Sequence, residues 1–117
     1  SFRSAAGAVS GGKTARLEAR LGEAACLLRL SQWQEASDAF AEVYREAPLL
    51  RHRAAAGLSL LHQRLGGTET ALSWADRAIE VSNEAIALDP GHAGAVHLRE
   101  AAVRERDAAL KAKGSAK

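Results

Sequence analysis

Apolar residues recur at helical spacing along most of the chain, in five runs separated by turn residues. The clearest run places Ala36, Phe40 and Val43 at i, i+4 and i+7, the spacing of a stripe along one face of a helix. Pro48 then bars this helix from continuing, because proline lacks the backbone N–H that the next turn needs. The pattern therefore predicts a helix over about residues 33–46.

Capping residues and glycines mark the ends of the helical runs. Ser31, with Gln34 three residues later, predicts an N-cap and a capping box for the helix over 33–46. The pair Gly66-Gly67 predicts the end of another helix, and Thr68 predicts the cap of the next. The same criteria predict four more helices, over about 13–30, 49–65, 68–88 and 92–111.

The segments outside these helices carry no apolar stripe. Residues 1–12 contain three glycines and are expected to form a flexible N-terminal segment, and residues 113–117 are expected to form a disordered tail. Residues 13–112 then make one helical domain, since 117 residues suffice for one domain at most. The chain starts at Ser1 and has no methionine, so we expect a fragment or a processed form.

Composition favours an all-α fold with a closely packed interior. Alanine supplies 27 of the 117 residues, whereas aromatic residues make up only 4%. Alanine has the highest helix propensity and lets helices approach closely. Only two prolines interrupt the pattern.

Charge, hydropathy and cysteine content exclude several function classes. The formal charge of +2, from 16 basic and 14 acidic residues, does not favour nucleic acid as a partner. No apolar run reaches the length of a membrane span. Cys26, the only cysteine, excludes an intramolecular disulfide, favours a reducing compartment such as the cytoplasm, and is expected to be a buried thiol within AACLL.

Residues 7–14, GAVSGGKT, satisfy the phosphate-loop pattern with Gly7, Gly12, Lys13 and Thr14. Such a loop holds phosphates with its backbone N–H groups and needs a buried strand before it. The preceding SFRSAA is not such a strand. Nucleotide binding is therefore a remote alternative, and a plain helix start is preferred.

Other catalytic or metal-binding patterns are weak. His92 and His97 are five residues apart, which places them on different sides of a helix, and no carboxylate or thiol completes a site. We expect no metal, no cofactor and no catalytic residues, so the chain is predicted not to be an enzyme.

The helices recur as pairs. Ala36 and Ala71, each early in the second helix of a pair, are 35 residues apart, and Pro48 and Pro90 are 42 residues apart. The seven extra residues lie within the helix over 68–88. Because seven residues make nearly two helical turns, the apolar stripe stays in phase.

In these features the chain resembles a tetratricopeptide repeat (TPR) domain over roughly 100 residues. The resemblance implies antiparallel helix-turn-helix repeats in an α-solenoid, with about two repeats and a C-terminal capping helix. It departs from the family pattern at Arg20 and Glu23, where large apolar residues are usual. The residues that match the repeat signature are Ala24, Trp33, Ala36, Phe40, Pro48, Ser59, Ala71, Ala78 and Pro90.

The same resemblance implies a concave groove, lined by the first helix of each pair, that binds a peptide or a helix of a partner protein. The groove positions carried over are Glu18, Leu21, Ala25, Leu28, Arg29, Arg53, Ala56, Leu60, Gln63, Arg64, His97, Ala101 and Arg104. Leucines there would supply apolar contact and arginines would pair with carboxylates. A non-catalytic protein-interaction module for an acidic and apolar segment is the first hypothesis. A structural segment of a longer solenoid, or a subunit that self-assembles into a homo-oligomer, is the alternative.

Overall fold

A computed structural model describes the backbone of residues 9–115 and the side chains of residues 12–111. Within that range the chain forms helices and turns and no strand, which confirms the predicted all-α class. The helices are α1 (Val9–Arg29), α2 (Trp33–Glu46), the short 3-10 helix η2 (Pro48–Leu50), α3 (Arg51–Arg64), α4 (Thr68–Leu88) and α5 (Ala93–Ser115).

The bounds of α2 and α4 are those that the apolar pattern predicted, but α1 and α5 are longer than predicted. Helix α1 already includes residues 9–12, and α5 continues through residues 113–115. Both extensions lie beyond the apolar stripe in the sequence, so the pattern of apolar residues could not reveal them. Residues 1–8 and 116–117 of the two predicted terminal segments lie outside the described residues.

The turn from α1 to α2 differs from its prediction. The N–H of Ser31 donates to the carbonyl of Leu28 at 3.0 Å, and the N–H of Gln32 donates to the carbonyl of Leu27 at 2.9 Å. These two bonds, with Ser31 at a φ of 62°, form a Schellman motif that ends α1. The predicted N-cap at Ser31 is therefore wrong: Gln32 occupies that position and makes no side-chain capping bond.

The turn from α3 to α4 repeats this geometry with glycine in the left-handed position. Gly66 has a φ of 82°, its N–H bonds to the carbonyl of Gln63 at 3.1 Å, and the N–H of Gly67 bonds to the carbonyl of His62 at 2.8 Å. The predicted glycine turn is confirmed. Thr68 is the first residue of α4 and not its cap, because Gly67 occupies the N-cap position.

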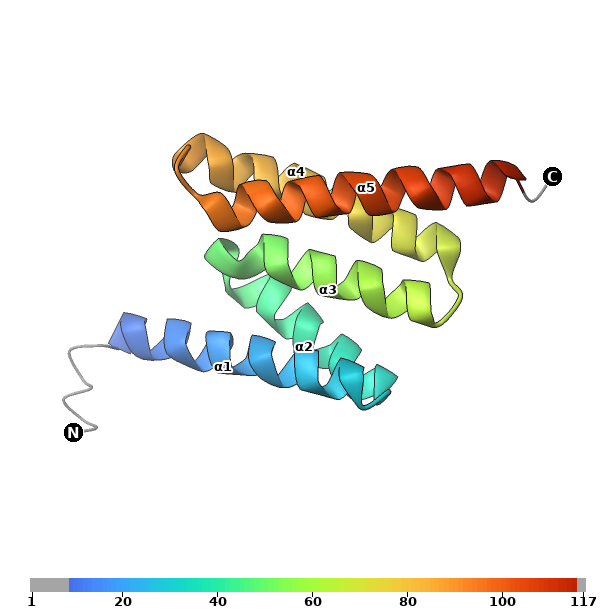
Figure 1. Cartoon of the computed structure of the whole chain (residues 1–117). Coiled ribbons are helices and arrows are strands. Elements are labelled where there is room, and N and C mark those ends of the chain that lie inside the picture. The colour runs from blue at the N-terminus through green and yellow to red at the C-terminus, as the bar shows by residue number, and fades with distance from the viewer. Residues whose placement is uncertain (1–8, 116–117) are drawn as a thin grey trace.

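Each helix packs against the next one along the chain, and α3 also contacts α1 and α5. In Figure 1, α1, α3 and α5 lie side by side in one layer, and α2 and α4 lie behind them. The turns consequently lie at two opposite edges of the molecule. One edge carries the α1–α2 and α3–α4 turns, and the other carries η2 and the α4–α5 turn.

Small residues allow this close packing. Ala24, Ala36, Ala54 and Ala78 are wholly buried where helices meet. Phe40, at 3% exposure, is the large side chain at the centre of the α1–α2–α3 cluster. The residues of the predicted repeat signature are buried, except for the half-buried Trp33 and the two exposed prolines, Pro48 in η2 and Pro90 in the α4–α5 turn.

An ion-pair network joins α1 to α2 on their outer side. Arg20 Nε donates to Glu42 Oε1 at 2.8 Å, Arg20 Nη1 donates to Glu23 Oε1 at 2.8 Å, and Arg16 Nη1 donates to Glu42 Oε2 at 3.2 Å. These arginines hold the pKa of the Glu42 carboxyl below its ordinary value, chiefly through the hydrogen bond from Arg20. Arg20 and Glu23 are thus joined to the α1–α2 interface by ionic contact and not by apolar packing.

Candidate binding groove

A hollow of about 300 Å³ opens between α1, α3 and α5. We call it the groove hollow. Its lining includes the largely buried Leu21, Leu28 and Phe40, together with the half-buried Leu60 and Leu98. This hollow is open to solvent and mostly apolar, and its size is at the lower end of the range of ligand pockets.

The shape of the hollow depends on residues with little or no side chain. Gly57 of α3 lines it, and the ring of Phe40 lies so close that a Cβ at residue 57 would meet three ring atoms closer than 3.0 Å. Gly22 and Ala25 of α1 line the other side. A larger residue at any of these positions would fill part of the space.

The structure brings together some of the predicted groove residues. Leu21, Ala25, Leu28, Arg53 and Leu60 line the groove hollow. The other predicted contact residues do not line it: Glu18, Arg29, Ala56, Gln63, Arg64, His97, Ala101 and Arg104.

Leu21 and Leu28 belong to the core more than to the surface. Each is 5% exposed and packs with Ala24 and Phe40 in the main core cluster. They therefore support the hollow from within, and Leu60 is the predicted leucine that a ligand can reach. The spacing of Leu21 and Leu28 along α1 could not show whether they face the core or a ligand. Helix α1 packs on both α2 and α3, so its apolar stripe has no single buried side.

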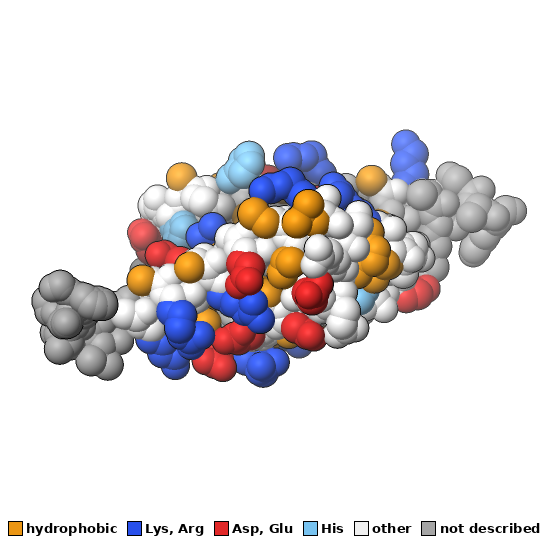
Figure 2. Space-filling model, turned by 90° about the horizontal axis from the view of Figure 1, so that it is seen from below, with side chains coloured by type: hydrophobic (Ala, Val, Ile, Leu, Met, Phe, Trp, Pro, Cys, Tyr) orange, Lys and Arg blue, Asp and Glu red, His pale blue; other side chains and the backbone are white. Residues whose placement is uncertain are grey.

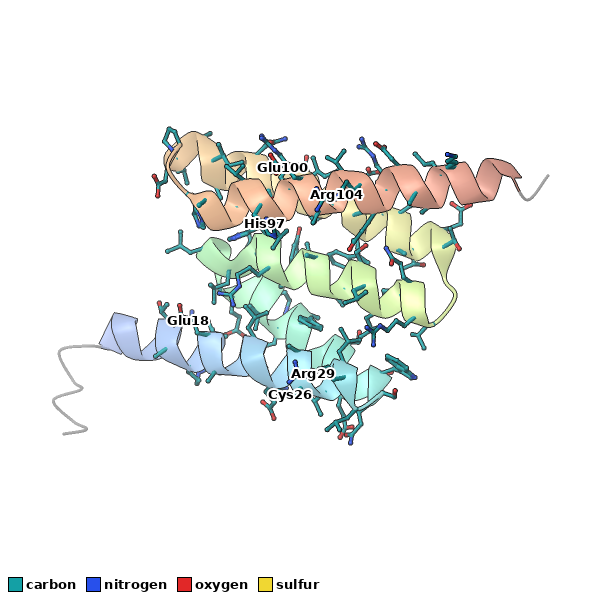
Figure 3. All side chains as sticks on the ribbon, viewed as in Figure 1. Glu18, Cys26, Arg29, His97, Glu100 and Arg104 are labelled. Carbon is teal, nitrogen blue, oxygen red and sulfur yellow. The ribbon has the colours of Figure 1, made fainter. Side chains whose placement is uncertain are left out.

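On α5 the predicted groove residues differ from the one that lines the hollow. His97 and Arg104 are exposed on α5 (Figure 3) and do not line the hollow, whereas Leu98 does. The repeat spacings contained the signal that finds Leu98. A step of 35 residues leads from Leu21 to Ala56, and a further step of 42 residues leads to Leu98.

The arginines divide into paired and unpaired groups. Arg16, Arg20, Arg77 and Arg106 pair with carboxylates. Arg53, exposed on α3, lines the groove hollow and forms no ion pair with any described residue. The hollow thus combines apolar walls with an unneutralised positive charge.

A pair of histidines lies at the edge formed by η2 and the α4–α5 turn. His52 is 3% exposed, and its ring meets the ring of His92 edge-on, with centroids 5.3 Å apart. Burial lowers the pKa of His52, and the charges of His92 and Arg53 lower it further. His92 Nδ1 accepts a hydrogen bond from the N–H of Ala95 at 3.1 Å, so it caps α5. The sequence offered no stripe position that marks His52 as buried.

Cys26 is exposed, contrary to the prediction of a buried thiol. It lies on the outer side of α1, where Arg29 Nη2 donates to its Sγ at 3.2 Å. The apolar run AACLL turns through more than one helical turn, so one of its residues must face outward.

The phosphate-loop pattern lies in a helix. Residues 9–14 belong to α1, whereas a phosphate loop needs non-helical backbone before the helix begins, and Gly7 lies outside the described residues. Lys13 and Thr14 are exposed on α1. The described side chains contain no group of three histidine, cysteine or acidic residues placed to hold a metal ion.

No helix in the described part of the chain combines the length and the apolar content needed to cross a bilayer. Comparison with known proteins gives no relative: no family model, no curated protein and no solved structure matches the chain.

Proposed function

We propose that the chain is a non-catalytic protein-interaction module whose α1–α3–α5 face binds an apolar and acidic segment of a partner protein. The observation that carries the proposal is the groove hollow, an apolar space beside the unpaired Arg53. Apolar burial supplies most of the affinity of such a site, and the charge supplies orientation and faster association.

A TPR-like arrangement is part of this proposal. It is supported by the antiparallel packing of consecutive helices, by the contacts of α3 with α1 and α5, and by two turns with the same hydrogen bonds. In such an arrangement the first helices of successive pairs share one face, and that face carries the groove hollow.

A selection experiment with a library of displayed random peptides tests the function. We expect enrichment of peptides in which a large apolar residue stands beside Asp or Glu. Amide signals of Leu60 and Leu98 should shift when a selected peptide is titrated and followed by NMR. The proposal fails if selection enriches no common motif, or if the shifts gather elsewhere.

Two variants separate the apolar and the ionic parts of the site. Leu60→Ala should weaken binding of the selected peptide at every salt concentration, whereas Arg53→Glu should weaken it mainly at low salt, because salt screens exposed charges. Arg77→Glu is the matched control, since Arg77 lies on α4 and pairs with Glu80 at 2.8 Å. Equal losses in the Arg53 and Arg77 variants would show that overall charge, and not this site, governs binding.

A further inference from the structure

Two strongly exposed leucines lie at each of the two turn-bearing edges of the molecule. Leu49 (74% exposed) and Leu88 (81%) lie at the edge formed by η2 and the α4–α5 turn. Leu30 (67%) and Leu65 (49%) lie at the opposite edge, beside the α1–α2 and α3–α4 turns. Exposed apolar side chains grouped in this way mark an interaction surface more often than single ones do.

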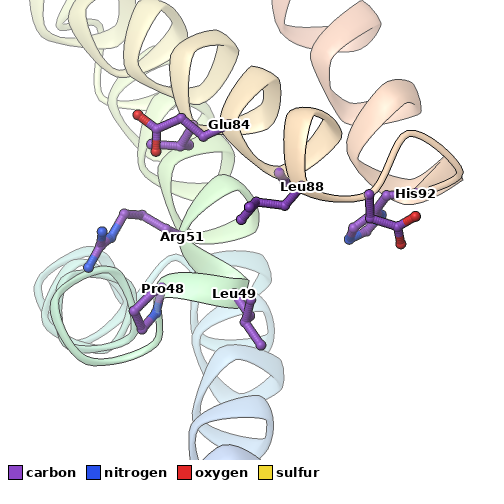
Figure 4. A pocket seen from close by; sticks show the side chains of 9 residues that line it. Pro48, Leu49, Arg51, Glu84, Leu88 and His92 are labelled. Atoms are coloured by element: carbon purple, nitrogen blue, oxygen red, sulfur yellow. The ribbon is translucent and has the colours of Figure 1, made fainter.

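Leu49 and Leu88 border a second hollow of about 340 Å³, which we call the edge hollow (Figure 4). Pro48, Val81 and Ala85 add to its apolar lining. It is separate from the groove hollow, with which it shares no lining residue. Its size suits one large apolar side chain.

The side chains that line the edge hollow carry two negative charges, on Glu84 and Asp89, against one positive charge, on Arg51, so the negative charge is in excess. Glu84 and Asp89 line it, and neither forms an ion pair with a described residue, although Asp89 Oδ1 accepts the N–H of Gly91 at 3.1 Å. Arg51 also lines it, but its Nε donates to the carbonyl of Tyr44 at 2.7 Å and its guanidinium lies over the Tyr44 ring. An occupant should therefore bring an apolar side chain next to a basic one.

The opposite edge of the same molecule carries that combination. Leu30 follows Arg29, and Leu65 follows Arg64, and neither arginine has a carboxylate partner among the described residues. Leu30 is the more exposed of the two leucines, and the α1–α2 turn places it at the tip of a hairpin.

We propose that a second copy of this chain docks at the edge hollow. Leu30 of one copy enters the hollow of the next, and Arg29 lies against Glu84 and Asp89. The two surfaces are different, so the contact is head-to-tail and each copy retains one free edge for a further copy. This assembly is independent of the groove and leaves the α1–α3–α5 face open. Figure 2 shows the α1 side of the molecule, where hydrophobic side chains are interspersed with acidic and basic ones.

Sedimentation velocity at low salt, from about 10 µM to about 1 mM, covers the range of a weak interface. The average mass of the wild-type chain should rise with concentration. Leu30→Ser and Leu88→Ser should each weaken self-association by about tenfold or more, the loss expected for one buried leucine. Leu110→Ser is the control, because Leu110 is 50% exposed on α5 and belongs to neither proposed surface.

Mixing the two variants tests the head-to-tail geometry. The Leu30→Ser chain retains an intact edge hollow, and the Leu88→Ser chain retains an intact Leu30. A mixture should therefore form a complex that stops at two copies, at a concentration where each variant alone remains mostly monomeric. In the same way, Arg29→Glu and Glu84→Arg should each weaken association, and both changes in one chain should restore it.

A wild-type chain that remains monomeric up to about 1 mM at low salt would overturn the proposal, even if a foreign peptide with adjacent leucine and arginine bound the edge hollow. A mixture of the two leucine variants that behaves as the sum of its parts would also overturn it. Circular dichroism of each variant shows whether the fold is retained, which we expect because the replaced leucines are at least half exposed and Arg29 and Glu84 are exposed.

Discussion

Replacing Gly57 by alanine should destabilise this protein, although the same change in the interior of a helix usually stabilises it. Alanine has a helix propensity about 0.8–1 kcal/mol better than that of glycine. At residue 57 the added Cβ would overlap with the ring of Phe40. Overpacking of a core costs about 1–3 kcal/mol, and contact with three ring atoms favours the upper part of that range. We therefore expect a net loss of about 1–2 kcal/mol in the free energy of unfolding.

Gly22→Ala provides the matched control. Gly22 also lies within a helix, but a Cβ there would meet no atom within 4 Å. That variant should gain about 0.5–1 kcal/mol. Urea unfolding followed by far-UV circular dichroism gives both values, provided that the slope of the transition is unchanged.

The origin of the effect is tested by changing Phe40 as well. Phe40→Ala alone should cost about 3–5 kcal/mol, a large part of the stability of a small domain. Phe40→Leu keeps a large apolar side chain in the core but replaces the aromatic ring that lies against Gly57 by a smaller group. Gly57→Ala should therefore cost less in the Phe40→Leu background than in the wild type. A Gly57→Ala protein that is as stable as wild type, or an equal cost in both backgrounds, would refute the contact between the ring and the α3 backbone.

Three further predictions concern single side chains. Ser31 and Gly66 both have a left-handed backbone conformation, which glycine adopts more readily than other residues. Ser31→Gly should therefore stabilise the fold by about 0.5–1 kcal/mol, and Gly66→Ala should destabilise it by about 1 kcal/mol. Thermal melts of both variants check the two signs. Ser59→Ala should cost about 1 kcal/mol because the Ser59 hydroxyl donates to the buried backbone carbonyl of Ala71. Ser82→Ala should be neutral or stabilising because the Ser82 hydroxyl is buried without a hydrogen-bond partner among the described residues; urea midpoints of the two variants check both predictions. Burial lowers the pKa of His52 in the folded state, so the unfolded chain binds the proton at a higher pH than the folded chain does. The free energy of unfolding should therefore be highest above pH ~6.5 and fall as the pH drops below that value. Urea unfolding at several pH values should show a weaker dependence of this free energy on pH for His52→Gln.

The sequence predicted the helices well because the buried face of each helix carries apolar residues at a spacing of three to four. Phe40 and Val43 are buried as their stripe required, and Pro48 ends α2 as its chemistry required. These are local properties, and neighbouring residues are enough to reveal them.

The candidate site could be predicted only in part, because it depends on how three helices meet. The pattern gave Leu21 and Leu28 the same role as Leu60, although the first two support the hollow from inside the core. It missed Leu98, which the repeat spacings select once both the 35- and 42-residue steps are applied. The exposure of Cys26 was also beyond a local reading, since it depends on which side of α1 lacks a neighbouring helix.

The availability of charge for binding is likewise a property of packing and not of composition. Arg20 and Arg53 are the same residue type, but α2 presents Glu42 to Arg20 across the helix interface, and no described carboxylate reaches Arg53. A paired arginine has already lost part of its hydration and gains little from a new partner, whereas an exposed and unpaired one can still form a charge-assisted hydrogen bond. The ion pairs between α1 and α2 therefore leave Arg16 and Arg20 with little charge to offer a partner, whereas Arg53 and Arg29 have no carboxylate partner among the described residues.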